Sequence, residues 1–226
     1  MYYKEEKGRL AVMILLRLGV LVFGYFIGTF QTGYIYGKRH GIDIREHGSG
    51  NSGTTNTLRV LGWKAGAVTF AGDLLKAIFA VLLVHFAFKD KYPEAIKILE
   101  LYAGFGTVLG HNFPFFLKFK GGKGIACTAG VILAICPLAA PVCLVLFVAA
   151  VALTRYVSLG SILVVTAYII QTLIFNYFGL LNVADAYKLE YNILAACFTV
   201  MAIWRHRANI VRLINGTENK FGNKAK

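Results

Sequence analysis

The chain is poor in charged residues and cysteine, and each shortage excludes a class of protein. Of its 226 residues only 15% are charged and 57% are hydrophobic, which is outside the usual composition of a soluble domain. The four cysteines lie in apolar segments without a CxxC spacing, so neither a disulfide framework nor a zinc site is expected. No repeat or low-complexity tract divides the chain. We therefore expect a single domain over residues 1–226.

Long apolar runs, separated by short polar stretches, make up most of the sequence. Several reach the ~20 residues that a helix needs to cross ~30 Å of hydrocarbon. The pattern predicts an all-α, polytopic membrane protein, some of whose helices are short. The expected helices are 10–36, 62–88, 95–113, 124–136, 138–154, 157–178 and 190–205. The first run is too long for the apolar core of a signal peptide and lacks a small-residue cleavage site, so we expect it to be retained.

The segment 124–154 leaves two topologies open. Pro137 and Pro141 interrupt it, and proline removes a helical hydrogen bond. A tight hairpin near 136–141 gives seven spans, whereas one kinked helix gives six. With seven spans and the N-terminus outside, fifteen of the 24 basic residues share one side with three acidic residues. Such an excess marks the cytoplasmic side. We therefore expect about seven transmembrane helices and a cytoplasmic C-terminus.

Two segments combine glycines with cations: GSGNSGTTNTLR over 48–59 and GHNFPFFLKFKGGKG over 110–124. Glycine lets backbone N–H groups converge on an anion. Arg59 and Lys123 add charge-assisted hydrogen bonds. In the seven-span topology these loops reach the cytoplasmic face together with RYVSLGS at 155–161 and RHRANIVRLINGTE at 205–218. The sequence thus predicts a site for phosphorylated ligands at the lipid–water boundary.

These motifs resemble those of the bacterial integral-membrane, acyl-phosphate-dependent glycerol-3-phosphate acyltransferases. Residues 48–59 match the pattern G-S-x-N-x-G-A-T-N-x-x-R, with Thr54 where alanine is commoner. Residues 110–124 match G-H-x-F-P-x-F-x-x-F-K-G-G-K-G, and residues 205–218 match R-H-x-x-N-I-x-R-L-x-x-G-T-E. The three motifs occur in the expected order and cover nearly the whole chain.

The resemblance implies a reaction: transfer of a fatty acyl group from acyl phosphate to the 1-hydroxyl of sn-glycerol 3-phosphate. The products are 1-acylglycerol 3-phosphate (lysophosphatidic acid) and phosphate, in the first step of phospholipid synthesis. It implies no cofactor, no metal and no nucleic acid; the partners are both substrates and membrane lipid. Protein partners stay open, with a monomer as the simplest assembly. The expected location is the bacterial cytoplasmic (inner) membrane, with the active site facing the cytoplasm.

The resemblance also assigns roles to individual residues. Ser49, Arg59, His206 and Asn209 are expected to be catalytic, and Glu218 is a structural position. Substrate binding is expected of Gly50, Asn51, Gly53, Thr55, Asn56, His111, Lys120, Gly121, Gly122, Lys123, Gly124, Ser158 and Ser161. For the two serines of the sixth span, helix capping and phosphate binding stay equally open. For His111, capping of the third span and substrate binding are also equally open.

Several features have other interpretations. GGKG is not a P-loop, because Leu117 occupies the first glycine position and Gly124 follows the lysine, so nucleotide hydrolysis is not expected. His85 and Asp90 have the H-x4-D spacing of another acyltransferase class but fall at the outer end of the second span. Asp73 and Lys76 lie one turn apart inside that span, where they are either functional or a neutralising pair, and Arg17 has no evident partner. A transporter or channel for a phosphorylated anion is the alternative function, against which stands the lack of an inverted repeat.

Overall fold

All regular elements of the described residues are helices. The structure is a computed structural model that describes residues 2–222, with side chains from residue 7 onward. The α-helices are α1 (Tyr2–Thr29), α2 (Thr32–Arg39), α3 (Thr54–Leu61), α4 (Trp63–Phe88), α5 (Ile96–Asn112), α6 (Ile125–Ile135), α7 (Ala140–Thr154), α8 (Val157–Tyr177), α9 (Lys188–Arg205) and α10 (Arg207–Ile214). Short 3-10 turns are η1 (Ile44–Glu46), η2 (Phe115–Leu117), η3 (Pro137–Ala139) and η4 (Asp185–Tyr187). The all-α prediction is confirmed.

The expectation of one continuous helix over 10–36 is wrong. α1 ends at Thr29 and α2 begins at Thr32, with Gln31 in an extended conformation between them. The break leaves the carbonyl of Phe30 without a helical partner, and the ammonium of Lys76 on α4 donates to it. The Gln31 side chain donates to the carbonyl oxygen of His111 at 3.0 Å. Groups distant in sequence therefore satisfy the polar atoms that the break exposes.

The segment 124–154 forms two helices, as the hairpin interpretation requires. α6 ends at Ile135, the 3-10 turn η3 follows, and α7 begins at Ala140. The start of α6 and the start of α8, which follows α7 after two residues, line the same cavity, so the chain reverses direction between α6 and α7. α6 packs mainly on α4, whereas α7 packs mainly on α8. A single kinked helix is therefore excluded.

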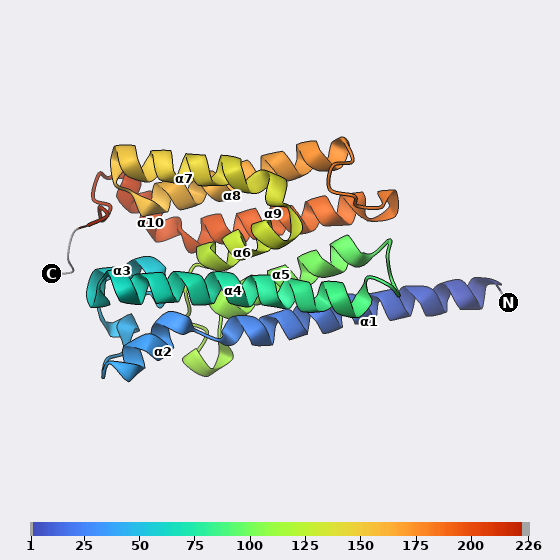
Figure 1. Cartoon of the computed structure of the whole chain (residues 1–226), viewed down its shortest axis with the longest axis horizontal. Helices are drawn as coiled ribbons and strands as arrows, with labels where there is room; N and C mark the ends of the chain where they lie inside the picture. Colours follow the sequence, from blue (N-terminus) through green and yellow to red (C-terminus); the bar gives the residue numbers. More distant parts are fainter. Residues whose placement is uncertain (1, 223–226) are drawn as a thin grey trace.

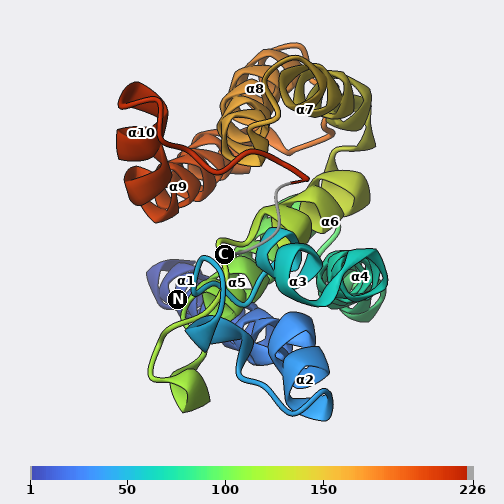
Figure 2. The same ribbon diagram turned by 90° about the vertical axis from the view of Figure 1, so that its left-hand side faces the viewer.

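The helices form two groups with α6 between them, as Figure 2 shows from the end of the bundle. One group contains α1, α4 and α5, with α2 and α3 at its end; the other contains α7, α8 and α9 (Figure 1). The core between them is apolar and includes Leu101, Val131, Tyr168 and Phe198. The short helices α2, α3 and α10 gather at one end of the molecule, which we call the cavity end.

Close packing of α1 on α5 depends on glycine. Gly24 and Gly28 of α1 face the backbone of α5, and Gly106 and Gly110 of α5 face that of α1. A Cβ at any of these four positions would lie 2.0–2.1 Å from a carbonyl oxygen of the opposite helix. Small residues four apart that let two backbones approach are typical of helix pairs in membranes.

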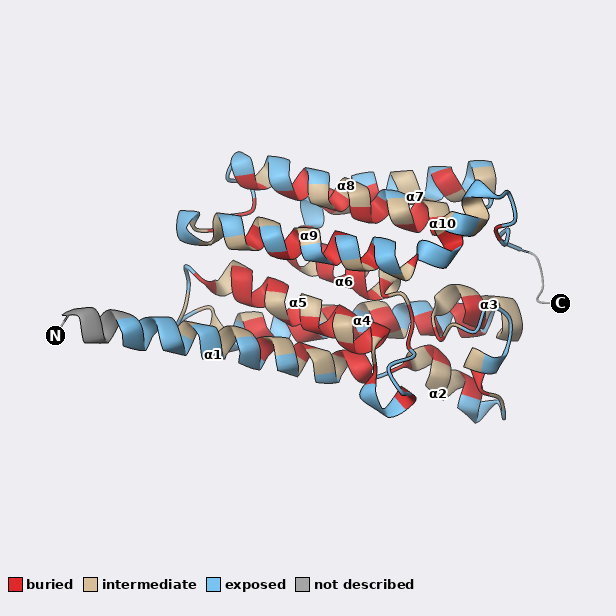
Figure 3. Ribbon diagram, turned by 180° about the vertical axis from the view of Figure 1, so that it is seen from behind, coloured by how far each residue is buried: buried red, intermediate tan, exposed pale blue. Residues whose placement is uncertain are grey.

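Exposed residues lie along the outer sides of the helices (Figure 3), and many of them are large and hydrophobic. Leu15, Leu144 and Leu153 are 68%, 64% and 85% exposed. By length and composition, four helical segments could cross a membrane, namely residues 7–39, 63–88, 137–154 and 157–177. α6 is apolar but has only 11 residues, or about 16 Å. The prediction of some short helices is confirmed.

Two polar clusters lie far from the cavity. Arg17 of α1 binds Glu190 of α9 through two hydrogen bonds of 2.6 and 2.7 Å. Arg17, for which the sequence indicated no partner, is therefore in an ion pair. Tyr102 donates to the same carboxylate. His85 lies 2.6 Å from Glu100 and does not line the cavity, in agreement with its interpretation as a helix-end residue.

Candidate functional site

A cavity at the cavity end is lined by segments from four parts of the sequence. It is bounded by residues of loop one (48–59), of loop two (110–124), of the start of α8 and of the α9–α10 junction, together with parts of α4 and α7. The lining residues are Ser49, Asn51, Gly53, Thr54, Thr55, Asn56, Arg59, Phe70, Asp73, His111, Lys123, Gly124, Ile125, Ala126, Phe147, Val157, Ser158, Ser161, His206, Asn209, Arg212, Glu218 and Asn219.

Three helices begin at this cavity. The first residues of α3, α6 and α8 line it, after the N-cap residues Gly53, Gly124 and Tyr156. The first N–H groups of an α-helix lack an intrahelical acceptor, and the helix dipole makes that end partly positive. Three such ends at one cavity form a strong site for anions.

Two cations in the lining have no carboxylate partner of their own. Among the described residues, no side chain or backbone group forms a hydrogen bond or ion pair with the Arg59 guanidinium, and Lys123 bonds only the amide of Asn209. The two lining carboxylates, in contrast, are neutralised: Asp73 by Lys76 and Glu218 by Arg212. The cavity therefore has positive charge available for an added anion.

A chain of hydrogen bonds holds Lys123 in place. Its ammonium donates to Oδ1 of Asn209, and Nδ2 of Asn209 donates to Oε1 of Glu218 at 3.0 Å. Nε of Arg212 donates to Oε2 of Glu218 at 2.9 Å. Burial lowers the pKa of Lys123 to about 8, while the nearby Glu218 carboxylate opposes that shift. The structural role predicted for Glu218 agrees with this geometry.

His206 sits between α9 and α10 with one ring nitrogen already bonded. Its Nδ1 lies 2.8 Å from the carbonyl oxygen of Ala202, so Nδ1 carries the proton and Nε2 is left as an acceptor. Burial, then the charge of Lys123, lowers the pKa of His206 to about 4. The ring is therefore neutral at physiological pH and can accept a proton or a hydrogen bond.

Loop one is organised by the side chain of Asn56. Its Nδ2 lies within 3.0 Å of the carbonyl oxygens of Ile44, His47 and Asn51, and its Oδ1 accepts from the N–H of Ser49 at 2.7 Å. The amide of Asn56 is thus committed to the fold of the loop, although the residue also borders the cavity. These bonds place Ser49 at the cavity mouth, with its side chain exposed.

Loop two folds against His111. A Cβ at Gly121 would lie 2.1 Å from the carbonyl oxygen of His111, and one at Gly122 would lie 2.0 Å from its Nε2. Arg205, which sequence reasoning did not select, donates to the carbonyl oxygens of Gly121 and Gly122 at 3.0 and 2.6 Å. Arg205 directly precedes His206 in the third motif, and this position could have identified it as a site residue.

Most residues predicted for the site do converge. Four do not line the cavity: Gly50, Gly121 and Gly122, which shape the loops, and Lys120, which is exposed. Neither Ser158 nor Ser161 caps α8, whose N-cap residue is Tyr156. The hydroxyl of Ser161 donates to Val157 at 2.8 Å, whereas that of Ser158 is buried with no partner in the part of the chain that the structure describes. Lining residues that the sequence did not assign to the site include Phe70, Asp73, Phe147 and Arg212.

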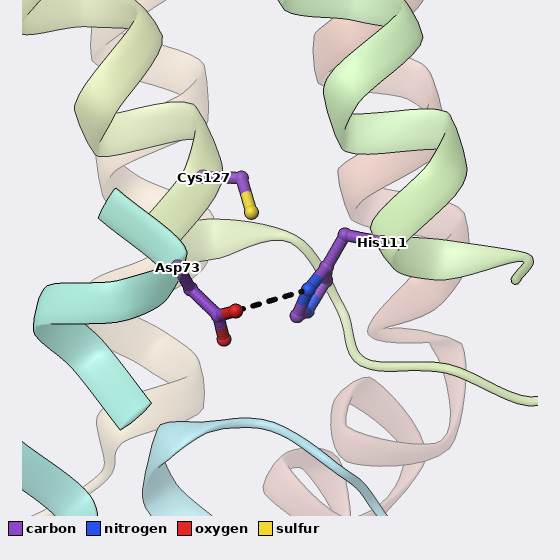
Figure 4. A group of neighbouring side chains, drawn as sticks. All are labelled: Asp73, His111 and Cys127. Atoms are coloured by element: carbon purple, nitrogen blue, oxygen red, sulfur yellow. Dashed lines mark ion pairs between the residues drawn. The ribbon is translucent and has the colours of Figure 1, made fainter. Parts of the chain in front are cut away.

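His111, Asp73 and Cys127 form a buried group at the inner wall of the cavity (Figure 4). They come from α5, α4 and α6, and their ligand atoms lie within 4.8 Å of one another. Such a group can hold a metal ion, but here the ammonium of Lys76 lies 2.9 Å from Asp73 Oδ1 and 3.0 Å from His111 Nδ1. A protein cation therefore already occupies the place beside these two ligands. His111 does not cap α5, because the C-cap residue is Phe113.

The helix bundle with its apolar surface and the cation-lined cavity are the features of an integral membrane protein that binds anionic ligands. The model of the glycerol-3-phosphate acyltransferase family matches residues 18–216. The chain therefore belongs to this family. A glycerol-3-phosphate acyltransferase of Clostridioides difficile is 43% identical over 211 residues, which are 91% of this chain and 95% of the relative. One from Bacillus subtilis is 45% identical over 202 residues, covering 89% and 95% of the two chains.

Two crystal structures show the same fold. Both are of PlsY (YgiH), an integral membrane glycerol 3-phosphate acyltransferase, in a glycerol 3-phosphate form and a lysophosphatidic acid form. Their TM-scores are 0.76 and 0.73 at 33% identity, and each comparison covers 91% of this chain and at least 95% of the other. The expected family and an all-helical, integral-membrane fold are thereby confirmed.

Proposed function

We propose that this protein acylates the 1-hydroxyl of glycerol 3-phosphate, giving lysophosphatidic acid in the first step of phospholipid synthesis. The observation that carries the proposal is the cavity itself, where three helix N-termini meet two cations without an ion-pair partner among the described residues, Arg59 and Lys123. The family and the ligands named for the two crystal structures agree with this reaction.

The acyl donor we propose is acyl phosphate, with no coenzyme and no metal. Donor and acceptor then both carry phosphate, which suits a cavity with several cations and N–H donors. Phe70 on α4, Ile125 on α6 and Phe147 on α7 form an apolar part of the lining. An acyl chain can lie along this part while its phosphate reaches the polar part.

The proposed mechanism is direct transfer without an acyl-enzyme. The hydroxyl oxygen of glycerol 3-phosphate attacks the acyl carbonyl, the bond from the carbonyl carbon to the phosphate oxygen breaks, and the hydroxyl proton leaves with the phosphate. Because phosphate is a good leaving group, positioning and cationic stabilisation supply most of the catalysis. Nε2 of His206 is the alternative proton acceptor.

We assign Arg59 and Lys123 to phosphate binding, with Lys123 on glycerol 3-phosphate. Ser49 is a ligand at the cavity mouth rather than a nucleophile, because no histidine is bonded to its hydroxyl among the described residues. Asn209 positions Lys123. The hydroxyl of Ser158 is a further phosphate donor. Backbone N–H groups at Gly53, Thr55 and Gly124, and the Asn51 side chain, complete the proposed binding surface.

We infer a topology of seven spans, with the cavity end in the cytoplasm. Three helix pairs, α4–α5, α6–α7 and α8–α9, each start and finish at residues that line or border the cavity, which supports an even number of crossings after α1. The N-terminus is then outside, and the protein lies in the bacterial cytoplasmic membrane as one domain. A monomer contains the whole cavity.

The mechanism is tested by trapping and by kinetics. Protein incubated with acyl phosphate labelled in the acyl chain, without glycerol 3-phosphate, is expected to carry no covalent label. Initial rates are expected to show both substrates bound before phosphate leaves. A stable acyl-Ser49 adduct, or ping-pong kinetics, would contradict direct transfer. Uptake of glycerol 3-phosphate into sealed vesicles without ester formation would instead favour a transporter.

A further inference from the structure

Lys76 is a buried lysine whose ammonium hydrogens are all used inside the protein. Its Nζ donates to the carbonyl oxygen of Phe30, to Oδ1 of Asp73 at 2.9 Å and to Nδ1 of His111 at 3.0 Å. Oδ1 of Asp73 also faces Nδ1 of His111, but at 3.6 Å (Figure 4), which is longer than the 3.0 Å from Nζ of Lys76. An ammonium has three donors and no acceptor, so Nδ1 of His111 accepts from Lys76. The imidazole is therefore neutral, and its proton is on Nε2.

The Nε2–H group of His111 has no acceptor among the described residues. His111 is only 3% exposed, yet it lines the cavity. Its Nε2 edge faces Gly122, where a Cβ would lie 2.0 Å away. Because Gly122 has no Cβ, the ring packs directly against its backbone, and only the part of His111 that lines the cavity is open to a ligand. An N–H at a cavity wall that has no protein acceptor can donate to a ligand or to water.

The backbone of His111 is held by two further hydrogen bonds. Its backbone carbonyl accepts from Nε2 of Gln31 at 3.0 Å and from the N–H of Gly122 at 3.1 Å. Ser52 of loop one donates to Oε1 of Gln31. Both phosphate-binding loops and the α1–α2 break therefore hold this residue in place. A fixed backbone at His111 limits where its ring can lie, as a binding site on a rigid scaffold requires.

We propose that the Lys76–Asp73 pair is a positioning device that holds His111 in the Nε2–H form, so that His111 donates to an anionic oxygen of the substrate. That oxygen is either a phosphoryl oxygen or the oxyanion that develops on the acyl carbonyl. The proposal rests on the acyl transfer proposed above. Asp73 balances the charge of Lys76, so the device supplies a donor without adding net charge. The positioning role explains why Asp73 and Lys76 are present inside the membrane, where burying ionisable residues costs free energy.

The tautomer can be measured without any activity. In protein labelled with ¹⁵N in its five histidine rings, the His111 signals are identified by their loss in His111→Gln. We expect an unprotonated Nδ1 and a protonated Nε2 in the substrate-free protein. The neutral double variant Asp73→Asn/Lys76→Met is expected to lose this preference. A protonated Nδ1 in the unsubstituted protein would overturn the proposal, whatever the reaction.

Two substitutions at His111 separate a donor role from a structural one. The amide nitrogen of glutamine can reach the place of Nε2, whereas that of asparagine reaches only the place of Nδ1. We expect His111→Asn to lower kcat/KM by on the order of 10²-fold, as removal of an oxyanion donor does, and His111→Gln to keep at least about tenfold more activity than that. A change mainly in KM identifies the phosphoryl oxygen, and one mainly in kcat identifies the oxyanion. Equal losses in both variants would contradict the donor role.

A second ion pair of the bundle supplies the matched control. Arg17→Met/Glu190→Gln removes an intramembrane pair that does not line the cavity. We expect this control to keep near-normal kcat/KM. At a similar Tm, Asp73→Asn/Lys76→Met is expected to lower kcat/KM by about tenfold or more. Equal activity in the two double variants would show that the Lys76–Asp73 pair acts on stability alone. If the unsubstituted protein does not acylate glycerol 3-phosphate, the proposed function fails, whereas the tautomer result still stands.

Discussion

Substituting Glu218 by glutamine should shift the pH dependence of the enzyme. Glu218 is linked to Lys123 through the amide of Asn209, and its carboxylate raises the pKa of Lys123 against the larger effect of burial. Lys123 binds phosphate only when protonated, so its contribution is present below its pKa of about 8 and is lost as the pH rises through that value. The unsubstituted enzyme should therefore show an alkaline limb near pH 8.

The size of the shift follows from the distance between the charges. Two hydrogen bonds and one amide separate the ammonium from the carboxylate, or roughly 7 Å. A unit charge at that distance contributes about 1.2 kcal/mol at an effective dielectric constant near 40 and about 2.4 kcal/mol near 20. Its removal should lower the Lys123 pKa by about one unit. At pH 8 most Lys123 would then be neutral, and kcat/KM for glycerol 3-phosphate should fall about fivefold or more beyond the loss seen at pH 6.

The assay is phosphate release at pH 5.5–9.5, with kcat/KM for glycerol 3-phosphate measured at each pH. Lys123→Arg is the control, because arginine does not titrate in this range and the limb should disappear. Glu218→Gln also weakens the bond from Arg212, which costs about 1–2 kcal/mol independently of pH. A loss that is the same at every pH, with the limb unmoved, would refute the electrostatic role and leave Glu218 as a structural residue only.

Three other substitutions test separate parts of the account. Arg59→Lys should lower kcat/KM by about tenfold or more with Tm unchanged, because a planar fork becomes a point charge; unchanged kinetics would show that Arg59 only contacts lipid headgroups. His206→Gln should remove an acid limb of the pH–rate profile near pH 4 and change nothing near pH 6.5, since the pKa of His206 is about 4. Loss of a limb near neutrality would instead identify His206 as the proton acceptor, titrating in the enzyme–substrate complex. Gly106→Val should abolish or strongly destabilise the fold, because its Cβ would lie 2.1 Å from the Leu21 carbonyl oxygen, whereas Gly19→Ala, with nothing within 4 Å, should leave Tm within a few degrees.

The long helices could be predicted because an apolar run of membrane length has few other structures available to it. The expected 62–88 and 157–178 agree with α4 and α8 within a residue. The break at Phe30 was missed because the flanking Gly28 and Gly33 do not by themselves end a membrane helix. The break depends on Lys76, which lies 46 residues further along the chain. The short helix α3 was also missed, since its apolar content is too low to identify it, whereas the spacing of His206 and Asn209 indicates a helix where α10 lies.

The site could be predicted from its motifs, but the motifs do not tell which of their members face the cavity. Lys120 and Lys123 both stand in loop two, and only Lys123 lines it. Asn56 matches a motif position, yet its amide is used to fold loop one. The partner of Arg17 is 173 residues away, and nothing local indicates such a pairing. Contacts between distant segments are what the sequence alone could not provide.

In the proposed reaction, acyl phosphate donates the acyl group directly to glycerol 3-phosphate in one step. The most direct measurement gives purified protein glycerol 3-phosphate with acyl phosphate, acyl-CoA and acyl carrier protein as competing donors, each labelled differently in the acyl chain. We expect lysophosphatidic acid to carry only the label from acyl phosphate, with one phosphate released for each ester formed. Label from either thioester at a comparable rate, or phosphate release without ester, would contradict the account.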